Sequence, residues 1–83
     1  MQSLQNFKNE LAESDLNKME FDIVQLIEFD SEFIVMTLDS ENSVYLVNVF
    51  DRKCRDFDNS HSWTGNYTEA FQIYQSLILS RIG

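Results

Sequence analysis

Proline is absent from this 83-residue chain, and glycine occurs only at Gly65 and Gly83. Flexible linkers are rich in glycine, so regular structure joined by short turns is expected. Cys54 is the only cysteine, which excludes an internal disulfide or a zinc site built from several cysteines. No segment approaches the roughly 20 apolar residues of a membrane span, and residues 1–8 lack the apolar stretch of a signal peptide. These absences predict a cytoplasmic protein.

Hydrophobic residues make up 43% of the chain and include seven Phe, three Tyr and one Trp. Such an aromatic content supports a packed core and argues against disorder. The length allows one domain, residues 1–83, with a core of modest size.

Positive charge is scarce, because 14 acidic residues stand against six Lys and Arg and give a net charge of −8. Ten of the acids lie within residues 10–41, where Lys18 is the only cation, so this segment carries −9. Nucleic acids and anionic membranes repel such a chain, and direct binding to either is not expected. A basic protein or a nucleoprotein complex is the expected partner.

Hydrophobic spacing divides the chain into six elements. Leu4, Phe7 and Leu11 recur at helical spacing, with Ser3 as the expected N-cap and an end near Ser14. The period then changes to two, which predicts strands. The predicted strands are Phe21–Phe29, Phe33–Leu38, Val44–Phe50 and Cys54–Asp58, followed by a loop over Asn59–Asn66 and a helix over Tyr67–Arg81.

The expected fold is α+β, in the order α-β-β-β-β-α. Short polar connections favour an antiparallel meander of four strands, since parallel strands need long crossovers. The strand Phe33–Leu38 is apolar on both faces and is expected at the centre, and the polar strand Cys54–Asp58 at an edge. Asn66 and Glu69 resemble a capping box at the start of the last helix. Both helices are expected on one face of the sheet.

Few residues carry the chemistry of catalysis or metal binding. Cys54 and His61, oriented by Asp58, would be needed for a thiol hydrolase. We expect instead that Cys54 is a strand residue and His61 a solvated loop residue. His61 with Asp56 and Asp58, or Asp39 with Glu41, matches no metal-binding spacing. No enzymatic activity, metal or cofactor is expected.

Acidic residues two apart along a predicted strand would place carboxylates in a row on one face. Such a row suits a basic groove on a partner protein, although the same charges also serve solubility alone. Trp63 is either an exposed anchor for a partner or folds back to cover the core. The candidate partner-binding residues are Glu20, Asp22, Glu28, Asp30, Glu32, Asp39, Glu41 and Trp63.

The chain resembles small acidic inhibitors encoded by phages and mobile elements, especially anti-CRISPR proteins. The shared features are its length, the acids of residues 10–41, a strand-rich middle and the closing helix Tyr67–Arg81. That resemblance implies a non-enzymatic protein that blocks a CRISPR effector or nuclease. Immunity proteins that neutralise nuclease toxins share the same size and acidity. A different hypothesis is a regulatory or structural homodimer, which would pair through an open sheet face formed by Phe21–Phe29, Tyr45, Val47 and Val49.

Overall fold

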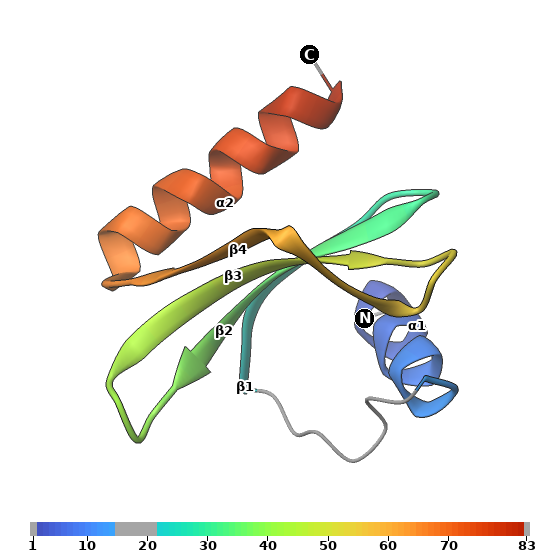
Figure 1. The fold of residues 1–83 in the computed structure, drawn as a ribbon, viewed down its shortest axis with the longest axis horizontal. Coiled ribbons are helices and arrows are strands. Elements are labelled where there is room, and N and C mark those ends of the chain that lie inside the picture. Colours follow the sequence, from blue (N-terminus) through green and yellow to red (C-terminus); the bar gives the residue numbers. More distant parts are fainter. Residues whose placement is uncertain (1, 15–21, 83) are drawn as a thin grey trace.

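The computed structural model describes residues 2–14 and 22–82, with the side chains of residues 59–63 excepted. Helix, four strands and helix follow one another as expected (Figure 1), and the α+β class with its antiparallel meander is confirmed. The elements are α1 (Gln2–Ala12), β1 (Asp22–Glu28), β2 (Glu32–Asp39), β3 (Val44–Asp51), β4 (Asp56–Gly65) and α2 (Tyr67–Ile82).

The strands lie in the order β1-β2-β3-β4, and each pairs antiparallel with the next. β2 therefore lies inside the sheet, as its apolar sequence predicts. Every residue from Phe33 to Thr37 is buried. A strand buried on both faces requires a layer of side chains above it and another below it.

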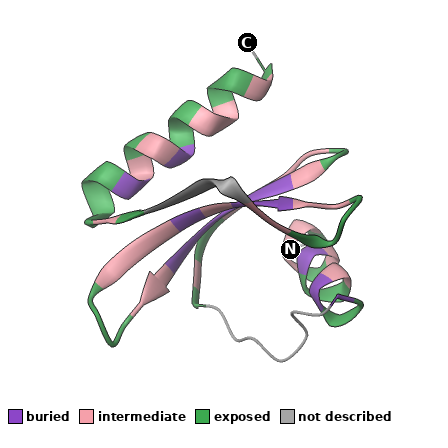
Figure 2. Ribbon diagram, in the orientation of Figure 1, coloured by how far each residue is buried: buried purple, intermediate pink, exposed green. Residues whose placement is uncertain are grey.

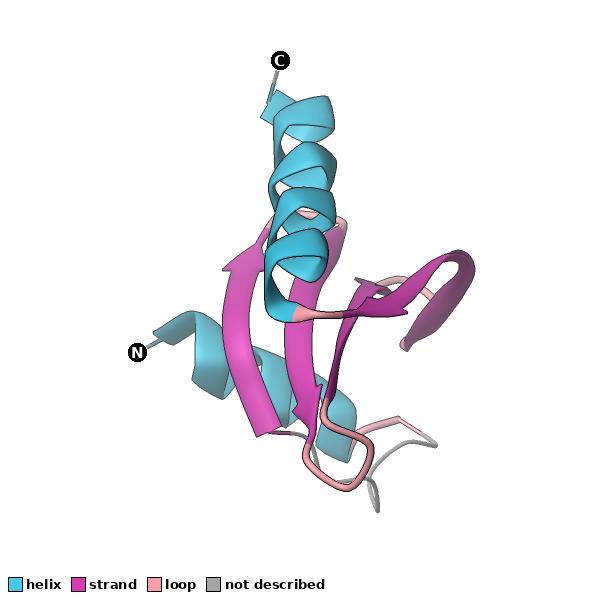
Figure 3. Ribbon diagram, turned by 90° about the vertical axis from the view of Figure 1, so that its left-hand side faces the viewer, coloured by secondary structure: helices cyan, strands magenta, loops and turns pink. Residues whose placement is uncertain are grey.

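The two helices supply these layers on opposite faces of the sheet (Figures 1 and 3), so the expectation that both cover one face is wrong. Successive residues of a strand point to opposite faces, and β2 is apolar at each of them. A single helix would leave half of these side chains exposed to water, so a helix is needed on each face. The cluster under α1 contains Phe7, Leu11, Phe33, Val35 and Phe50, and the cluster under α2 contains Ile34, Met36, Val47, Val49, Ala70 and Tyr74.

The β3 part of the sheet face suggested for dimerisation is consequently covered. Val47 and Val49 are buried beneath α2, and Tyr45 packs against the same cluster. The burial of Tyr74 in this layer raises the pKa of its phenol to about 12. An open apolar surface along β3, the dimer interface of the alternative hypothesis, is absent from the described part of the sheet.

The ends of the helices agree only in part with their predicted caps. α1 already includes Ser3, so Ser3 is not its N-cap. Ser14 does close the helix, because its hydroxyl donates to the carbonyl of Leu11 at 2.7 Å. At α2, the side-chain oxygen of Asn66 accepts the backbone N–H of Glu69 at 2.9 Å, and the Asn66 amide donates to the Glu69 carboxylate at 3.3 Å. Asn66 is therefore the N-cap of α2 as expected, although the bond to the Glu69 carboxylate comes from the Asn66 side chain and not from its backbone N–H.

β4 differs most from its prediction, which had a strand at Cys54–Asp58 and a loop at Asn59–Asn66. The strand runs over Asp56–Gly65, and Cys54 lies in the preceding turn. Its register against β3 shifts between the pairs Val49–Asp58 and Val47–Trp63, where β4 has three more residues than β3. Polar residues form this edge strand because its pairing uses backbone groups, which every residue other than proline possesses.

Neither helix within residues 2–14 and 22–82 is long and apolar enough to cross a membrane.

Candidate functional site

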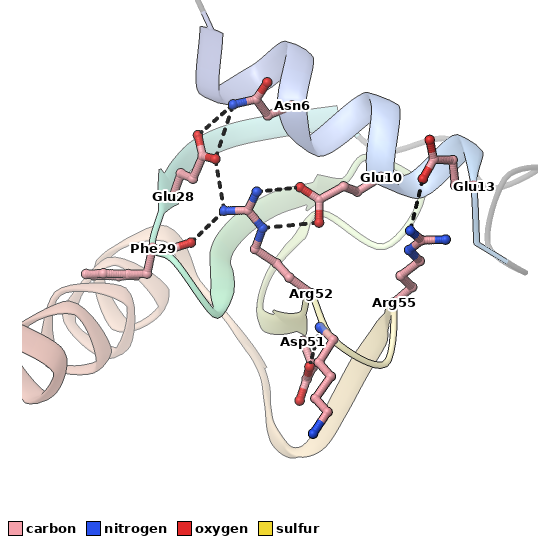
Figure 4. A network of polar contacts seen from close by, with 9 residues as sticks. Asn6, Glu10, Glu13, Glu28, Phe29, Asp51, Arg52 and Arg55 are labelled. Carbon is pink, nitrogen blue, oxygen red and sulfur yellow. Dashed lines mark hydrogen bonds and ion pairs between the residues drawn. The ribbon is translucent and has the colours of Figure 1, made fainter.

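Arg52, in the turn after β3, joins α1 to the β1–β2 hairpin (Figure 4). Its guanidinium forms two bonds with the Glu10 carboxylate, at 3.1 and 2.8 Å. It also donates to Glu28 at 2.9 Å and to the carbonyl of Phe29 at 2.7 Å. The same group lies 4.6 Å from the ring centroid of Phe33. One cation thus satisfies two carboxylates and a carbonyl above the aromatic core.

Hydrogen bonds and charge favour the ionised forms of Glu28 and Arg52. Asn6 donates its amide to both oxygens of Glu28 at 3.1 Å, which is the largest cause of a lowered pKa for that carboxyl. Burial opposes the charge of Arg52, but the contacts with Glu10 and Glu28 together raise the pKa of its guanidinium. The group is a structural clamp, because its donors and acceptors are occupied by one another.

Two further arginines neutralise acids of the 10–41 segment. Arg55 pairs with Glu13 at 3.2 Å on the surface. Arg81, near the end of α2, pairs with Glu32 at the start of β2. Together with Arg52, these arginines come from outside the segment, so much of its charge serves to hold the fold.

A continuous row of carboxylates from Glu28 to Glu32 does not form. Glu28 points to the face covered by α1, whereas Glu32 contacts α2 on the other face. Asp30 lies exposed in the turn between the two strands. The chain reverses at this turn, so spacing by two does not continue along one strand. Glu20 lies outside the described residues.

Three further acids of the segment lie at the opposite end of the β1–β2–β3 sheet, around a surface hollow of about 500 Å³. Asp22 comes from the start of β1, Asp39 from the end of β2 and Glu41 from the turn that follows. Thr37, Leu38 and Leu46 add the methyl and aliphatic groups beside them. This acidic hollow is lined by Asp22, Thr37, Leu38, Asp39, Ser40, Glu41 and Leu46.

The carboxylates of the acidic hollow differ from those of the Arg52 clamp because no cation of the described residues forms an ion pair with them. Asp39 is held by Asn42, whose side-chain amide donates at 2.8 Å and whose backbone N–H donates at 3.3 Å. The side-chain bond is the largest cause of the lowered pKa of Asp39. Asp39 therefore stays charged in a fixed orientation at neutral pH.

A second hollow of about 430 Å³ lies beside α1 and has lining residues in common with the acidic hollow. Leu4 and Lys8 of α1 line it with Ile23 and Val24 of β1, and it shares Asp22 and Leu38 with the acidic hollow. The sequence pattern identified the three acids but missed their apolar neighbours and Asn42. A detectable signal was Asp39 followed three residues later by Asn42, a spacing typical of a side-chain-bonded turn.

Among the described side chains, the other candidates do not form a site. Cys54 is exposed in the β3–β4 turn, where its backbone N–H and that of Lys53 are accepted by Asp51 at 3.1 and 2.8 Å. The side chains of His61 and Trp63 lie outside the described residues, although the backbone of Trp63 pairs with Val47. Among the described side chains, no group of three or more His, Cys, Asp or Glu is arranged to hold a metal ion.

Glu28→Gln is expected to weaken the loss of stability in acid. The ordinary pKa of Glu28 is 4.5, and the value in the folded chain lies below it. Such a carboxyl stabilises the fold above its ordinary pKa, and this contribution disappears as pH falls through the folded value. Wild type should therefore lose unfolding free energy below about pH 4.5, and the variant less of it. Urea unfolding followed by circular dichroism at several pH values measures both.

Asn6→Ala provides the matched comparison for this titration. It keeps the Glu28 carboxylate but removes the bond that lowers its pKa most. The acid loss of Asn6→Ala should be intermediate between those of wild type and Glu28→Gln. An unchanged acid slope in Glu28→Gln contradicts the role assigned to this carboxyl.

Comparison of the chain with protein-family models, with curated proteins and with solved structures finds no match.

Proposed function

We propose that this chain is a non-enzymatic inhibitor that binds a basic protein or nucleoprotein complex through its acidic hollow, in the reducing cytoplasm. The observation that carries the proposal is the separation of its carboxylates into two groups. Glu10, Glu28 and Glu32 are neutralised by arginines within the fold. Asp22, Asp39 and Glu41 surround one hollow without such a counter-ion among the described residues.

The lining of the acidic hollow suits the side chain of a lysine or arginine. These side chains combine an apolar stem with a charged end, and the two parts need different surroundings. Leu38 and Leu46 offer apolar contact to the stem, and the carboxylates of Asp22, Asp39 and Glu41 offer acceptors to the charged end. Basic grooves that bind nucleic acid display many such side chains. The proposed target is therefore a nucleic-acid-processing protein, such as a nuclease or CRISPR effector.

Removing the charge of the hollow should abolish capture of this target. The triple variant Asp22→Asn, Asp39→Asn, Glu41→Gln removes three negative charges while nearly preserving side-chain shape. Association should slow by about tenfold or more at low salt, because steering by complementary charge is lost. Binding of wild type should itself weaken as salt rises. Immobilised wild type and variant are compared for recovery of nucleases from lysate and for association rate with the recovered nuclease.

A charge-matched control separates the hollow from general acidity. Glu13→Gln, Asp30→Asn and Asp56→Asn together remove the same number of charges from exposed positions away from the hollow. The control should retain most of the wild-type association rate. Equal losses in the two triple variants would show that binding depends on net charge alone, and the hollow would then have no specific role.

A further inference from the structure

The β1 edge, which is the outer side of Asp22–Glu28, is a row of backbone groups at the end of the sheet. β1 pairs with β2 on its inner side and with no described strand on its outer side. Asp22, Val24 and Gln25 are exposed, and the rest of β1 is half-buried (Figure 2). An open edge of this kind accepts one more strand, because its donors and acceptors repeat at the spacing of a β-ladder.

One hydrogen bond identifies the backbone groups that face outward. The Phe29 N–H donates to the Glu32 carbonyl at 2.8 Å. Bonded and non-bonded pairs alternate along an antiparallel ladder, so Ile27 also bonds to β2. The alternate residues Leu26 and Glu28 therefore direct their N–H and C=O groups away from β2. Within the described part of the chain, no hydrogen bond reaches these outward groups.

Both hollows adjoin the start of the β1 edge. Asp22, the first residue of β1, lines the acidic hollow and the second hollow alike. Ile23, Val24 and Leu4 line the second hollow, so apolar groups lie beside the edge on the side of α1. Successive side chains of a strand point to opposite faces, so every second side chain of an added strand lies over this apolar lining. β1 is about 20 Å long, so a strand paired along it ends at the acidic hollow.

Charge determines which strand suits the β1 edge. The register that pairs the whole of β1 with a second copy sets Asp22 opposite Glu28 at both ends. Like charges directly opposite one another destabilise a strand pair, and the net charge of −8 on each copy adds repulsion. Lys8 is the only cation among the residues that line the two hollows, and Asp39 and Glu41 lie beyond Asp22. A strand that carries lysine or arginine is complementary to this edge.

We propose that the β1 edge binds an extended basic segment of the target, which adds a strand to the sheet and places a lysine or arginine side chain in the acidic hollow. The inference rests on the proposed function, because the segment belongs to the basic protein bound there. Backbone bonds to Leu26 and Glu28 provide affinity for any extended segment, whereas the hollow selects a basic side chain. The hollow accommodates one side chain, and pairing along β1 supplies the contact with the residues next to it.

A synthetic peptide of alternating lysine and valine, added to the full chain, tests this pairing. Amide hydrogen exchange, followed by NMR, should slow by about tenfold or more at Leu26 and Glu28 when the peptide binds, because their N–H groups become bonded. The N–H of Ile27 already bonds to β2 and should change little. Exchange at these amides reports strand pairing and not the general attraction between opposite charges.

Two methylated peptides provide a control of equal charge. Each carries methyl groups on alternate backbone nitrogens, and the two sets of nitrogens are complementary. The nitrogens that face β1 are donors in the pairing, so methylation of that set should abolish binding. Methylation of the other set should preserve it. Equal binding of the two methylated peptides overturns the proposal.

A charge variant of the protein tests the same edge from the other side. Gln25→Lys places a cation on the exposed edge and should weaken peptide binding by about tenfold or more. Gln72→Lys adds the same charge at an exposed position of α2 and should bind the peptide as wild type does. Peptide that does not bind, or that binds without slower exchange at Leu26 and Glu28, overturns the proposal. Slower exchange at high protein concentration without peptide assigns the edge to a second copy and also overturns it.

Capture of nucleases from lysate distinguishes this pairing from the proposed function. Both the triple variant of the acidic hollow and Gln25→Lys should lose capture, whereas Gln72→Lys should retain it. Capture that is lost in the triple variant and unchanged in Gln25→Lys supports the hollow and overturns the pairing along β1. Capture that is lost only in Gln25→Lys overturns binding through the hollow and supports the strand pairing.

Discussion

Phe33→Ala is expected to destabilise the chain by about 3–5 kcal/mol, the cost of truncating a fully buried phenylalanine. Phe33 has no exposed surface and lies in the central strand β2. Its ring meets that of Phe7 edge-on at 5.2 Å and that of Phe50 at 6.2 Å, and the Arg52 guanidinium covers it. A domain of this length has about 4–12 kcal/mol of stability in total. The variant should therefore be close to unfolding at room temperature.

Phe57→Ala is the matched control for this truncation. Phe57 belongs to the same cluster and meets the Phe50 ring at 5.4 Å, but it is half-buried and lies on the edge strand β4. Its loss should cost about 1–2 kcal/mol, in proportion to the smaller area removed from water. Urea unfolding followed by circular dichroism gives both values. Equal costs for the two variants would contradict the placement of the core beneath α1.

The comparison of sequence with structure shows how far hydrophobic periodicity reaches. It predicted the order of the six elements, the central position of β2 and the start of α2 at Asn66, because these depend on neighbouring residues. It did not show which face of the sheet each helix covers. The apolar character of both faces of Phe33–Leu38 does require a layer of side chains on each side, so the sequence contains a signal for helices on opposite faces.

The bounds predicted for β4 were wrong for a different reason. Asn59, Ser60, His61 and Ser62 are polar, and polarity favours a loop when residues are considered one at a time. The edge strand β4 is stabilised by backbone hydrogen bonds to β3. The sequence of β4 alone does not indicate where these bonds to β3 begin and end. The three-residue register shift between Val47 and Val49 is a property of the paired strands together. Local patterns cannot indicate it.

The candidate site was predicted in the same partial way. The sequence identified the excess of acid in residues 10–41 but not its division. Arg52 contacts Glu10 across 42 residues and Glu28 across 24, and such pairs have no local signature. Asp22 and Asp39 differ from Glu10 and Glu28 in having no arginine as an ion-pair partner among the described residues, and only the folded structure reveals this difference. The partner-binding role of Asp22 and Asp39 is the proposal that charge removal tests.

Arg52→Met is expected to destabilise the chain by about 2–3 kcal/mol. Breaking a fully buried ion pair would cost more, but the side chains of Arg52, Glu10 and Glu28 remain about a quarter exposed to water. The substitution removes four hydrogen bonds and leaves Glu10 and Glu28 close together without a counter-ion. Arg52→Lys keeps the charge but cannot make the two parallel bonds to Glu10. It should lose about half as much.

At acidic pH, the difference in unfolding free energy between Arg52→Met and wild type should become much smaller. The lowered pKa of Glu28 means that its ionised form stabilises the fold at neutral pH and that this contribution fades as pH falls below its ordinary value of 4.5. A protonated Glu28 no longer needs the arginine, so the two unfolding curves should converge in acid. Adding Glu10→Gln to Arg52→Met should recover part of the stability at neutral pH, since one uncompensated charge is removed. Two results would contradict this account: a loss of unfolding free energy in Arg52→Met that does not change with pH, and effects of Arg52→Met and Glu10→Gln that simply add. Arg52 would then act through its packing on Phe33 and not as the clamp between α1 and the β1–β2 hairpin.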